Sequence, residues 1–245
     1  MLKSEREKQI LDILSEQGFT SVEKLSKMLF SSESSIRRDL TNLENRGLVK
    51  RSYGGAELIV SQSNILPFNT RTFSFAEEKR AIAKKAVTLV KDGDVIFLDQ
   101  STTCYFLAME LTSKKGITVV TNSLSIQNFL SLTDIKVIST GGVLSNDDRS
   151  CFVGERAENT YKEIYADIAF FATKSLSEDG VVSDCTLEEI VLRKAMLKNS
   201  AKKVFLCNSQ KFNTKSPYIQ CTLSDVDIMV SEKEAEKYKK YCQTY

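Results

Sequence analysis

Apolar positions at the start of the chain recur every three to four residues, which is the spacing of amphipathic helices. The pattern predicts a helix over residues 4–17, with Gly18 as its C-terminal cap. Two shorter helices are expected after Ser21 and Ser32, whose hydroxyls suit the capping of a helix N-terminus. The N-terminal segment is therefore predicted to begin with three consecutive helices.

The third predicted helix has two faces of different chemistry. Ile36, Leu40 and Leu43 share its apolar face. At about 100° per residue, the opposite face holds four polar side chains and its flanks hold two more. These are Ser34, Arg38, Thr41 and Asn45 on the face, and Ser35 and Arg37 on the flanks.

A short hairpin is predicted after the third helix. Residues 48–51 and 56–60 flank a Tyr-Gly-Gly sequence that suits a tight turn. Three helices and a two-stranded ribbon form a winged helix-turn-helix, so residues 1–60 are predicted to be one such domain. The small polar segment SQSN begins a linker that is placed at residues 61–75.

From residue 76 to residue 245 the pattern changes to short apolar strands that alternate with helices. This alternation predicts an α/β domain with a mostly parallel sheet and helices on both faces. The strands are expected at residues 95–99, 118–121, 135–140, 168–173, 203–208 and 227–231. The helices are expected at residues 76–91, 103–111, 124–132, 155–165 and 186–200, with a closing helix after the last strand.

Length and composition agree with two domains and a cytoplasmic location. The chain has 245 residues, which exceeds the common single-domain size of roughly 100 to 150 residues. Charged residues make up 27% of the chain, and no apolar run approaches the roughly 20 residues that span a bilayer. The N-terminus lacks the apolar segment of a signal peptide, so no membrane association is expected.

Missing and scattered residue types exclude several kinds of chemistry. Histidine is absent, which excludes Ser-His-Asp and Cys-His nucleophile pairs and every histidine-containing zinc site. The six cysteines form no C-x-x-C pair and are interpreted as reduced thiols. Cys104 has no histidine to activate it and is not a convincing nucleophile. No metal, cofactor or enzymatic activity is expected.

Basic residues are concentrated in one short segment. The formal net charge is only +2, yet residues 34–56 hold five basic side chains against two acidic ones. The outer face of the third helix suits the major groove, and the basic wing tip suits phosphates or the minor groove. The candidate DNA-binding residues are Ser32, Ser34, Ser35, Arg37, Arg38, Thr41, Lys50, Arg51 and Tyr53. The alternative is a merely solvated basic face, which explains fewer of these features.

Polar loops follow the predicted strands of the second domain, at the edge where open α/β sheets bind ligands. Residues 99–103 open a helix whose backbone N–H groups and hydroxyls suit an anion such as phosphate. Thr121 and Asn122 follow the second strand, and Gly141 and Gly142 follow the third. Each loop alone is explained as a helix cap or a turn, but three loops on one edge favour a binding site.

The basic segment SSIRRDLTNLENRGLVKRSYGGA resembles the N-terminal signature of the DeoR family of bacterial transcriptional regulators. In that family a serine-capped recognition helix with an R-R-D-L core precedes an L-E-x-x-G turn and a basic wing that ends in G-G-A. The resemblance implies a regulator, most commonly a repressor, that binds double-stranded operator DNA. Ser31, Ser34 and Ser35 depart from the usual residues, which leaves the operator sequence open.

The second domain carries further landmarks of the same family, namely EKRAIAKKAVTLVKDGDVIFLDQSTT, TNS, GGVL, FVG, ADIAFFATKSL and LCNSQKF. The family's effector domain is related in fold to ribose-5-phosphate isomerase and binds phosphorylated sugars or related metabolites. The resemblance matches Asp99, Thr102 and Thr103 to the family's phosphate loop and Asn122 and Gly142 to residues that line its cleft. Lys211 matches the lysine of the family's last motif. Together with the loops themselves, the expected effector site comprises Asp99, Ser101, Thr102, Thr103, Thr121, Asn122, Gly141, Gly142, Lys174 and Lys211.

Four positions near this site depart from the family pattern. Ser101, Ala172 and Ser175 replace usual glycines, and Asn208 replaces a usual aspartate. Loss of glycine narrows backbone freedom, and loss of the carboxylate removes an acceptor for sugar hydroxyls. Lys174 either supplies a compensating charge or is solvated. The departures indicate a different effector or weaker binding.

The sequence therefore predicts a homo-oligomeric repressor, a dimer or tetramer, that a phosphorylated sugar releases from its operator. The main alternative is a sugar-phosphate isomerase-type enzyme with a DNA-binding head, which needs a carboxylate base that faces the substrate. The acidic residues Asp179, Asp184, Glu188 and Glu189 are better explained as favourable charges at a helix start. A third possibility is a regulator with a degenerate pocket that responds to a protein partner.

Overall fold

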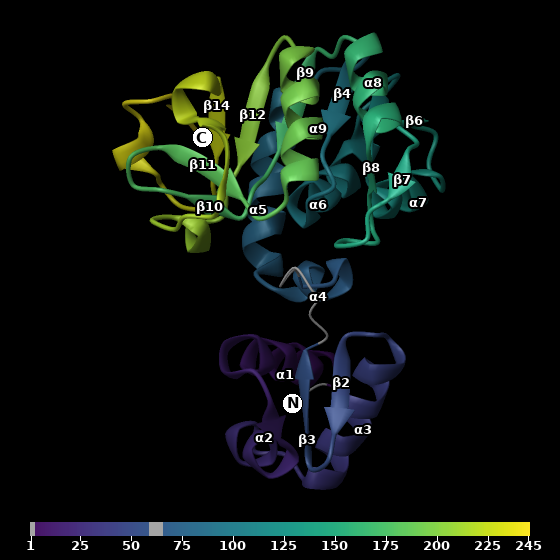
Figure 1. The fold of residues 1–245 in the computed structure, drawn as a ribbon, viewed down its shortest axis with the longest axis vertical. Coiled ribbons are helices and arrows are strands. Elements are labelled where there is room, and N and C mark those ends of the chain that lie inside the picture. Colours follow the sequence, from purple (N-terminus) through teal and green to yellow (C-terminus); the bar gives the residue numbers. More distant parts are fainter. Residues whose placement is uncertain (1–2, 59–65) are drawn as a thin grey trace. The chain divides into compact units, whose positions relative to one another are not determined.

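A computed structural model describes residues 3–58 and 66–245 (Figure 1). Contacts within the chain divide it into two units, Met1–Ala76 and Glu77–Tyr245. Each unit has its own hydrophobic core. No helix among the described residues is long and apolar enough to cross a membrane.

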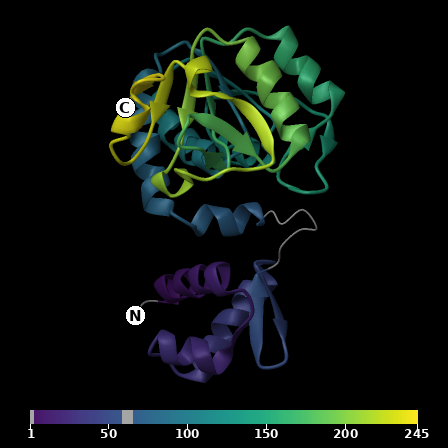
Figure 2. The same cartoon turned by 60° about the vertical axis from the view of Figure 1, so that its left-hand side comes forward.

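The first unit contains the predicted winged helix-turn-helix (Figure 2). Its elements are α1 (Lys3–Gln17), β1 (Thr20–Ser21), α2 (Val22–Met28), α3 (Glu33–Asn45), β2 (Val49–Ser52) and β3 (Gly55–Leu58). β3 lies between β1 and β2 in an antiparallel sheet. The predicted caps are confirmed, because Ser21 Oγ accepts from the N–H of Lys24 at 3.1 Å and Ser32 Oγ from that of Ser35 at 3.3 Å.

The apolar faces of the three helices meet in one core. Ile10, Leu25 and Leu40 are fully buried there. One ion pair adds a polar link between α1 and α3, since Arg6 Nε donates to Asp39 Oδ2 at 2.5 Å and Arg6 Nη2 to Oδ1 at 3.3 Å. The Asp39 carboxylate is buried and needs such a partner. The aspartate of the R-R-D-L segment therefore holds α3 in place rather than facing outward.

The segment between the winged helix and the α/β sheet contains one short helix. α4 (Phe68–Phe73) lies within the predicted linker, residues 61–75. The SQSN sequence at residues 61–64 lies outside the described residues. The next helix, α5 (Ala76–Ala86), begins where the second domain is predicted to begin.

The second unit is built on a seven-stranded sheet in which every strand pair is parallel. The strands are β4 (Val95–Leu98), β5 (Thr118–Thr121), β6 (Lys136–Ser139), β9 (Ile168–Phe171), β12 (Lys203–Leu206), β14 (Ile228–Val230) and β15 (Gln243–Thr244). Their order is β15-β14-β12-β9-β4-β5-β6. The six predicted strands are present, which confirms the α/β class. The order switches direction between β4 and β9, the kind of point at which open α/β sheets bind ligands.

Helices cover both faces of this sheet. They are α5, α6 (Thr102–Glu110), α7 (Leu124–Leu130), α8 (Glu155–Glu163) and α9 (Leu187–Lys198). Right-handed crossovers place α6 and α7 on one face, and α8 and α9 on the other. α8 and α9 lie side by side in Figure 1. Short 3-10 turns are η1 (Val87–Leu89), η2 (Leu111–Ser113), η3 (Ser209–Lys211), η4 (Leu223–Asp225) and η5 (Glu236–Tyr238).

Two small antiparallel sheets are absent from the sequence-based prediction. One has the order β10-β11-β13, with strands β10 (Ser175–Leu176), β11 (Val181–Asp184) and β13 (Tyr218–Thr222). The other pairs β7 (Val143–Leu144) with β8 (Phe152–Val153). Strands of two to five residues carry too little periodicity to be recognised.

The predicted closing helix is wrong. After β14 the chain forms only the turn η5, and β15 then pairs with β14 at the edge of the sheet. Tyr238 is fully buried, with its ring edge-on to that of Phe212 at 5.3 Å between centroids. Packing of Tyr238 on the core overrides the helix propensity of this charged segment.

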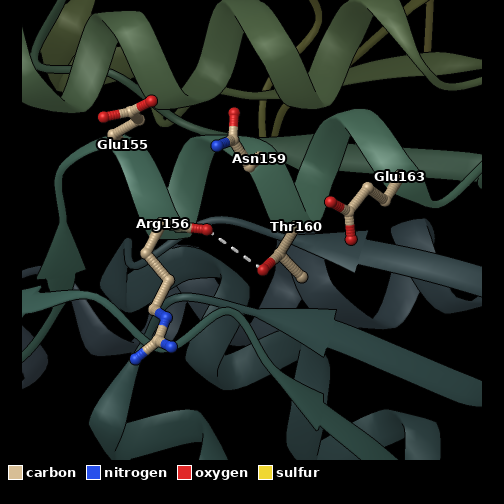
Figure 3. Close-up of a pocket in the computed structure, with 5 residues that line it drawn as sticks. All are labelled: Glu155, Arg156, Asn159, Thr160 and Glu163. Atoms are coloured by element: carbon tan, nitrogen blue, oxygen red, sulfur yellow. Dashed lines mark hydrogen bonds between the residues drawn. The ribbon is translucent and has the colours of Figure 1, made fainter.

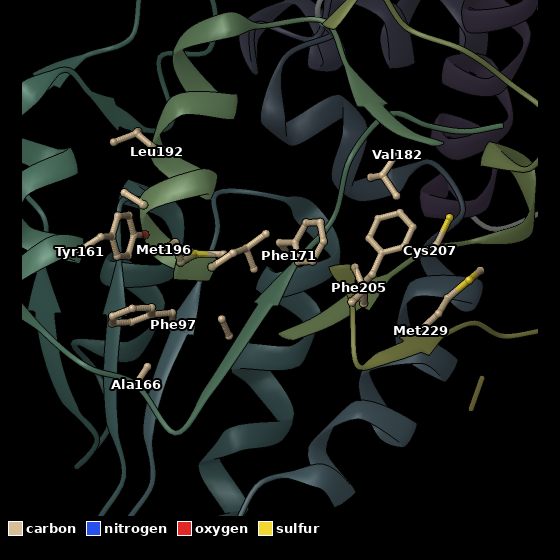
Figure 4. Packing of buried hydrophobic residues seen from close by; sticks show 14 of the residues in the cluster. Phe97, Tyr161, Ala166, Phe171, Val182, Leu192, Met196, Phe205, Cys207 and Met229 are labelled. Atoms are coloured by element: carbon tan, nitrogen blue, oxygen red, sulfur yellow. The ribbon is translucent and has the colours of Figure 1, made fainter. Parts of the chain in front are cut away.

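One hydrophobic cluster of the second unit lies between the sheet and helices α8 and α9 (Figure 4). The rings of Phe97 and Tyr161 meet edge to face at 5.1 Å, and those of Phe171 and Phe205 lie 5.1 Å apart. The hydroxyl of Tyr161 accepts a hydrogen bond from the N–H of Asn122 at 3.2 Å. Core packing therefore fixes a residue of the polar edge of the sheet.

The cysteines are all unpaired, as predicted. Cys104 is fully buried in α6, and this burial raises the pKa of its thiol well above the usual value, with the nearby Asp99 carboxylate adding to the effect. A thiol that stays protonated and inaccessible is a poor nucleophile. The geometry thus gives no support for covalent chemistry at Cys104.

Candidate functional sites

The outer face of α3 exposes the four polar side chains predicted for it, Ser34, Arg38, Thr41 and Asn45. The guanidinium of Arg38 makes no hydrogen bond or ion pair with any residue that the structure describes. Its N–H donors are therefore available to a partner outside the chain. Of the α3 side chains, Arg38 is the one best suited to reading the edge of a base.

The serines at the start of α3 bind one another. Ser32 Oγ lies 3.0 Å from the hydroxyls of both Ser34 and Ser35, in addition to capping the helix. Arg37 pairs with Glu33 at 3.1 Å on the exposed flank of α3. Exposed ion pairs of this kind contribute little stability, so Arg37 can exchange Glu33 for a DNA phosphate at little energetic cost. Ser32 has a capping role that does not depend on DNA.

The wing is attached to α3 by Arg51. Its Nη1 donates to the hydroxyl of Thr41 at 2.6 Å, and its backbone N–H donates to Glu44 Oε1 at 3.1 Å. Two of the predicted DNA-binding residues, Thr41 and Arg51, therefore contact each other. The sequence analysis gives Glu44 no role, because its partner lies in β2, beyond the turn that ends α3.

The tip of the wing projects its side chains into solvent. Tyr53 is fully exposed, and Lys50 is exposed without a partner among the described residues. Gly55 starts β3, where a Cβ atom would lie only 2.5 Å from the carbonyl oxygen of Thr20. That close approach requires glycine, and it holds the ribbon against β1.

Asp99, at the carboxyl end of β4, is fully engaged by the protein. Its Oδ1 accepts from the N–H of Ser101 at 2.9 Å, and its Oδ2 from the N–H of Ala172 at 3.1 Å and from Nε of Arg193 at 3.0 Å. The carboxylate is buried. Asp99 thus joins the loops after β4 and β9 at the switch point of the sheet, and it presents no free oxygen to an effector.

Arg193 is the buried charged residue at this edge of the sheet that the sequence analysis missed. It lies on the inner face of α9 and pairs with Asp99, with Asp184 at 2.9 Å and with Glu189 at 2.8 Å. Burial lowers the pKa of the Arg193 guanidinium, but the three carboxylates outweigh burial and raise it, so the group stays charged. Asp184 and Glu189 are therefore ion-pair partners in addition to lying near a helix start. The sequence offered one signal for this role: a charged residue stands among the apolar positions of the predicted helix, between Ile190 and Met196 and Leu197, which are buried.

Three buried polar atoms near this edge have no hydrogen-bond partner. They are Nη1 of Arg193, Oγ1 of Thr186 and Oδ1 of Asn208. Thr186 precedes α9, and Asn208 follows β12. Buried polar groups are normally satisfied, so these three atoms are candidates for contact with a polar ligand.

The predicted phosphate loop forms the start of α6. Ser101 Oγ accepts from the N–H of Cys104 at 3.1 Å and caps the helix. Its backbone is extended, with φ of −68°, so the glycine common in the family is not required at this position. The N–H groups of Thr102 and Thr103 have no acceptor among the described residues. Free N–H groups at a helix N-terminus are suited to an anion.

The loop after β5 is linked to the loop after β4. Nδ2 of Asn122 donates to Oε1 of Gln100 at 3.2 Å and to the carbonyl of Phe152 at 3.0 Å. Thr121 Oγ1 accepts from the N–H of Ser123 at 3.1 Å. Thr121 and Asn122 are both buried and position the loops, so the structure brings the first two predicted loops together.

The glycine loop after β6 meets α8. A Cβ atom on Gly142 would lie 2.6 Å from the carbonyl oxygen of Val153, and its φ of 113° also favours glycine. Gly141 lies beside Arg156, which borders a shallow hollow along α8 (Figure 3). The lining of this hollow includes none of the predicted effector residues; it is formed by Glu155, Arg156, Asn159, Thr160 and Glu163.

The two predicted effector lysines differ in environment. Lys174 is exposed and has no partner among the described residues, as its solvated interpretation requires. Lys211 is half-buried in η3, three residues after Asn208. Ser175, which stands where the family usually has glycine, is buried, and its hydroxyl lies 2.7 Å from the hydroxyl of Ser216.

One group of buried side chains has the composition of a metal site. Ligand atoms of Asp148, Cys151 and Glu189 lie within 4.8 Å of one another. Each is engaged by the protein, because Asp148 accepts from Ser150, Cys151 Sγ donates to the carbonyl of Asp148, and Glu189 pairs with Arg193. The three side chains therefore bind other groups of the protein interior.

Two family models match the chain. Residues 6–62 match the DeoR-like helix-turn-helix domain, and residues 74–233 match the DeoR C terminal sensor domain. Both matches agree with the resemblance found in the sequence.

Relatives of similar length cover almost the whole chain. The HTH-type transcriptional regulator GolR of Listeria innocua is 33% identical over 98% of this chain and 96% of its own. The glycerol-3-phosphate regulon repressor of Escherichia coli is 28% identical over 95% of this chain and 92% of its own. Among solved structures, ribose 5-phosphate isomerase A of Methanocaldococcus jannaschii matches 57% of this chain and 55% of its own, with 21% identity and a TM-score of 0.44.

Proposed function

The chain belongs to the DeoR family of transcriptional regulators, and on that premise we propose that it is a repressor of sugar-metabolism genes that a phosphorylated sugar releases from DNA. The observation that carries the DNA-binding part is the unpaired, exposed Arg38 on a helix whose other face is buried. One relative is named for a regulon of glycerol-3-phosphate, which is a phosphorylated metabolite. A regulator that binds the chromosome acts in the cytoplasm.

The proposed DNA contact places α3 in the major groove. Arg38 reads a base edge, with Ser34 and Asn45 beside it. Lys50 and Tyr53 on the wing contact the backbone or the minor groove. Arg51 keeps the wing at a fixed distance from α3 through Thr41 and Glu44. The head therefore presents its two DNA-contacting elements as one rigid surface.

The proposed effector site lies at the carboxyl edge of the sheet. The phosphate binds at the start of α6, where the N–H groups of Thr102 and Thr103 lack acceptors. The unpartnered atoms of Thr186, Arg193 and Asn208 supply donors and acceptors for hydroxyl groups. The side-chain amide of Asn208 can both donate and accept hydrogen bonds. The replacement of aspartate by asparagine therefore keeps an acceptor for the sugar hydroxyls and adds a donor, which changes the arrangement of hydroxyls that the site prefers.

The proposed repressor acts as a homo-oligomer. A single winged helix covers too little DNA for the affinity of a specific operator complex, so two heads are needed on two half-sites. Effector binding lowers operator affinity by favouring an arrangement of the heads that does not match the half-site spacing.

The proposed function includes no isomerase activity. Proton abstraction from a sugar carbon needs a carboxylate that is free to reach the substrate. The carboxylates of Asp99, Asp184 and Glu189 all pair with Arg193 instead. Aldose-ketose interconversion by the purified protein would contradict this conclusion.

Thermal unfolding with matched ligands tests the effector site. Each phosphorylated sugar is compared with the same sugar without its phosphate, and a ligand at about 100 times its Kd adds about 2.7 kcal/mol of stability. Ser101→Asp keeps a capping side chain but adds a negative charge where the phosphate binds, so the thermal shift is lost. Ser101→Asn is the matched neutral control and keeps the shift. If no phosphorylated sugar shifts the transition, the effector is a protein partner or a different class of metabolite.

A further inference from the structure

Phe30, in the turn between α2 and α3, combines backbone strain with an exposed ring. Its φ is 48°, in the left-handed region that favours glycine and asparagine, and the residue is 97% exposed. Phe75 has a similar φ of 52°, but it is only 44% exposed, so the chain itself covers more than half of that residue. A single exposed apolar side chain needs no explanation, whereas strain that no packing offsets marks a functional position.

Hydrogen bonds hold the turn that carries Phe30. Ser26 Oγ donates to the carbonyl of Ser31 at 2.6 Å, and the N–H of Ser31 donates to the carbonyl of Ser26 at 3.1 Å. On the other side of Phe30, Leu29 is buried in the core of the first unit. With both neighbours fixed in this way, the turn directs the ring of Phe30 away from the core.

The ring of Phe30 lies beside the start of α3. Phe30 is two residues before Ser32, the N-terminal cap of α3, so the Cα atoms of the two residues are at most about 7 Å apart. Ser34, in the first turn of α3, is exposed as well. In the proposed DNA complex this end of α3 enters the major groove, so a ring at its start reaches the same segment of DNA. The apolar groups that DNA offers there are thymine methyl groups and the deoxyribose of the backbone.

We infer that Phe30 is a DNA-contacting residue whose ring packs on an apolar group of the operator, a thymine methyl or a deoxyribose, beside the first turn of α3. The inference deepens the proposed function and rests on it for the placement of α3 in the major groove. Burial of the ring against DNA removes apolar surface from water and offsets the strain at Phe30. An apolar contact releases no counterions, so it raises affinity without changing the salt dependence.

Removal of the ring from the full chain tests the inference. Phe30→Gly and Phe30→Asn relieve the strain, so both variants are expected to be at least as stable towards urea as the original chain. The probe is the segment of the chain's own promoter that the protein protects from DNase I. Fluorescence anisotropy is expected to show about tenfold weaker binding of both variants to this duplex, with an unchanged slope of log affinity against log salt. Phe30→Leu keeps an apolar side chain and is expected to lose less affinity.

Deoxyuridine in place of thymidine identifies the group that the ring contacts. This replacement removes only the methyl groups of the duplex. If the ring packs on a thymine methyl, the replacement weakens binding of the original chain more than binding of Phe30→Gly. If the ring packs on a deoxyribose, the replacement weakens both proteins equally, and Phe30→Gly loses affinity for a scrambled duplex as well as for the promoter.

Tyr165→Asn is the matched control, because Tyr165 is an exposed aromatic residue of the second unit, and it leaves DNA affinity unchanged. Equal promoter affinity of Phe30→Gly and the original chain would overturn the inference and leave the proposed function standing. A loss of stability in Phe30→Gly would overturn it too, since the ring would then pack on the protein. If the original chain does not distinguish its promoter from a scrambled duplex, the proposed function and the inference both fail.

Discussion

Nε of Arg193 donates to the carboxylate of Asp99 at 3.0 Å, and this single contact joins α9 to the loop after β4 across 94 residues of sequence. Asp99 in turn holds the start of the loop after β9 through the N–H of Ala172. The loops after β4 and β9 and helix α9 are therefore positioned by one buried carboxylate. The Arg193 side chain is 3% exposed, so water contributes little to the pairing.

Replacing Arg193 with methionine is expected to destabilise the second unit strongly. The change leaves Asp99, Asp184 and Glu189 buried without a cation, and breaking a buried pair from one side costs about 3–5 kcal/mol. The free energy of unfolding is measured with urea. Arg193→Lys keeps the charge and is expected to lose less stability. Equal stability of the methionine variant and the original chain would show that the ion pair is not needed for folding.

Stability is expected to fall in mild acid partly through Glu232. Burial raises the pKa of the Glu232 carboxyl, but hydrogen bonds outweigh this effect and bring the pKa below its usual value. These bonds come from the N–H of Ser209 at 3.0 and 3.1 Å and from the hydroxyl of Ser231. A lowered pKa stabilises the fold above the unfolded value of about 4.3, and the contribution is lost as the pH falls through the folded value.

Glu232→Gln removes this titration. Urea unfolding of the original chain and of the variant between pH 7 and pH 3 is therefore expected to show their stabilities converging as the pH falls below about 5. A constant difference in stability at every pH would contradict the assignment to Glu232.

Arg38 and Lys50 are expected to affect DNA binding in different ways. Arg38→Ala removes a base contact, so it costs about 1–3 kcal/mol on the operator and relaxes base preference. Lys50→Ala removes a phosphate contact, weakens binding to all sequences alike and reduces the salt dependence by about one ion. Fluorescence anisotropy with specific and random duplexes at several salt concentrations separates the two effects. Identical behaviour of the two variants would contradict the proposed roles.

Phe30 is expected to be a site where the chain gains stability. It adopts φ of 48° in the turn between α2 and α3, and its ring is almost fully exposed. The left-handed conformation costs a non-glycine residue about 1–2 kcal/mol, and asparagine tolerates it better. Phe30→Asn is therefore expected to raise the free energy of unfolding of the first unit by up to about 1 kcal/mol. A loss of stability would show that the exposed ring packs on another part of the protein.

The winged helix could be predicted from the sequence because its signals are local. Ser21 and Ser32 cap helices within three residues, and the leucines of α3 recur at helical spacing. The parallel strands were recognised from their short apolar runs. The link from Arg51 to Thr41 was not predictable, since it depends on how the hairpin folds back onto α3.

The polar loops at one edge of the sheet were predictable from the sequence, but the contacts that their residues make were less so. The cap at Ser101 and the alternation of apolar strands with helices were enough to place these loops after parallel strands. The pairing of Arg193 with Asp99 joins residues far apart in sequence, and Tyr238 packs against the core instead of continuing a helix. Such contacts depend on the tertiary structure, which periodicity and composition do not contain.

The most direct test of a DNA-reading repressor is the affinity of the purified chain for its own promoter compared with a scrambled duplex. The account predicts a ratio of about 10³ or more at physiological salt, a loss of that preference in Arg38→Ala, and a fall in promoter affinity when a phosphorylated sugar is added. Equal affinity for the promoter and the scrambled duplex at every salt concentration would contradict the account.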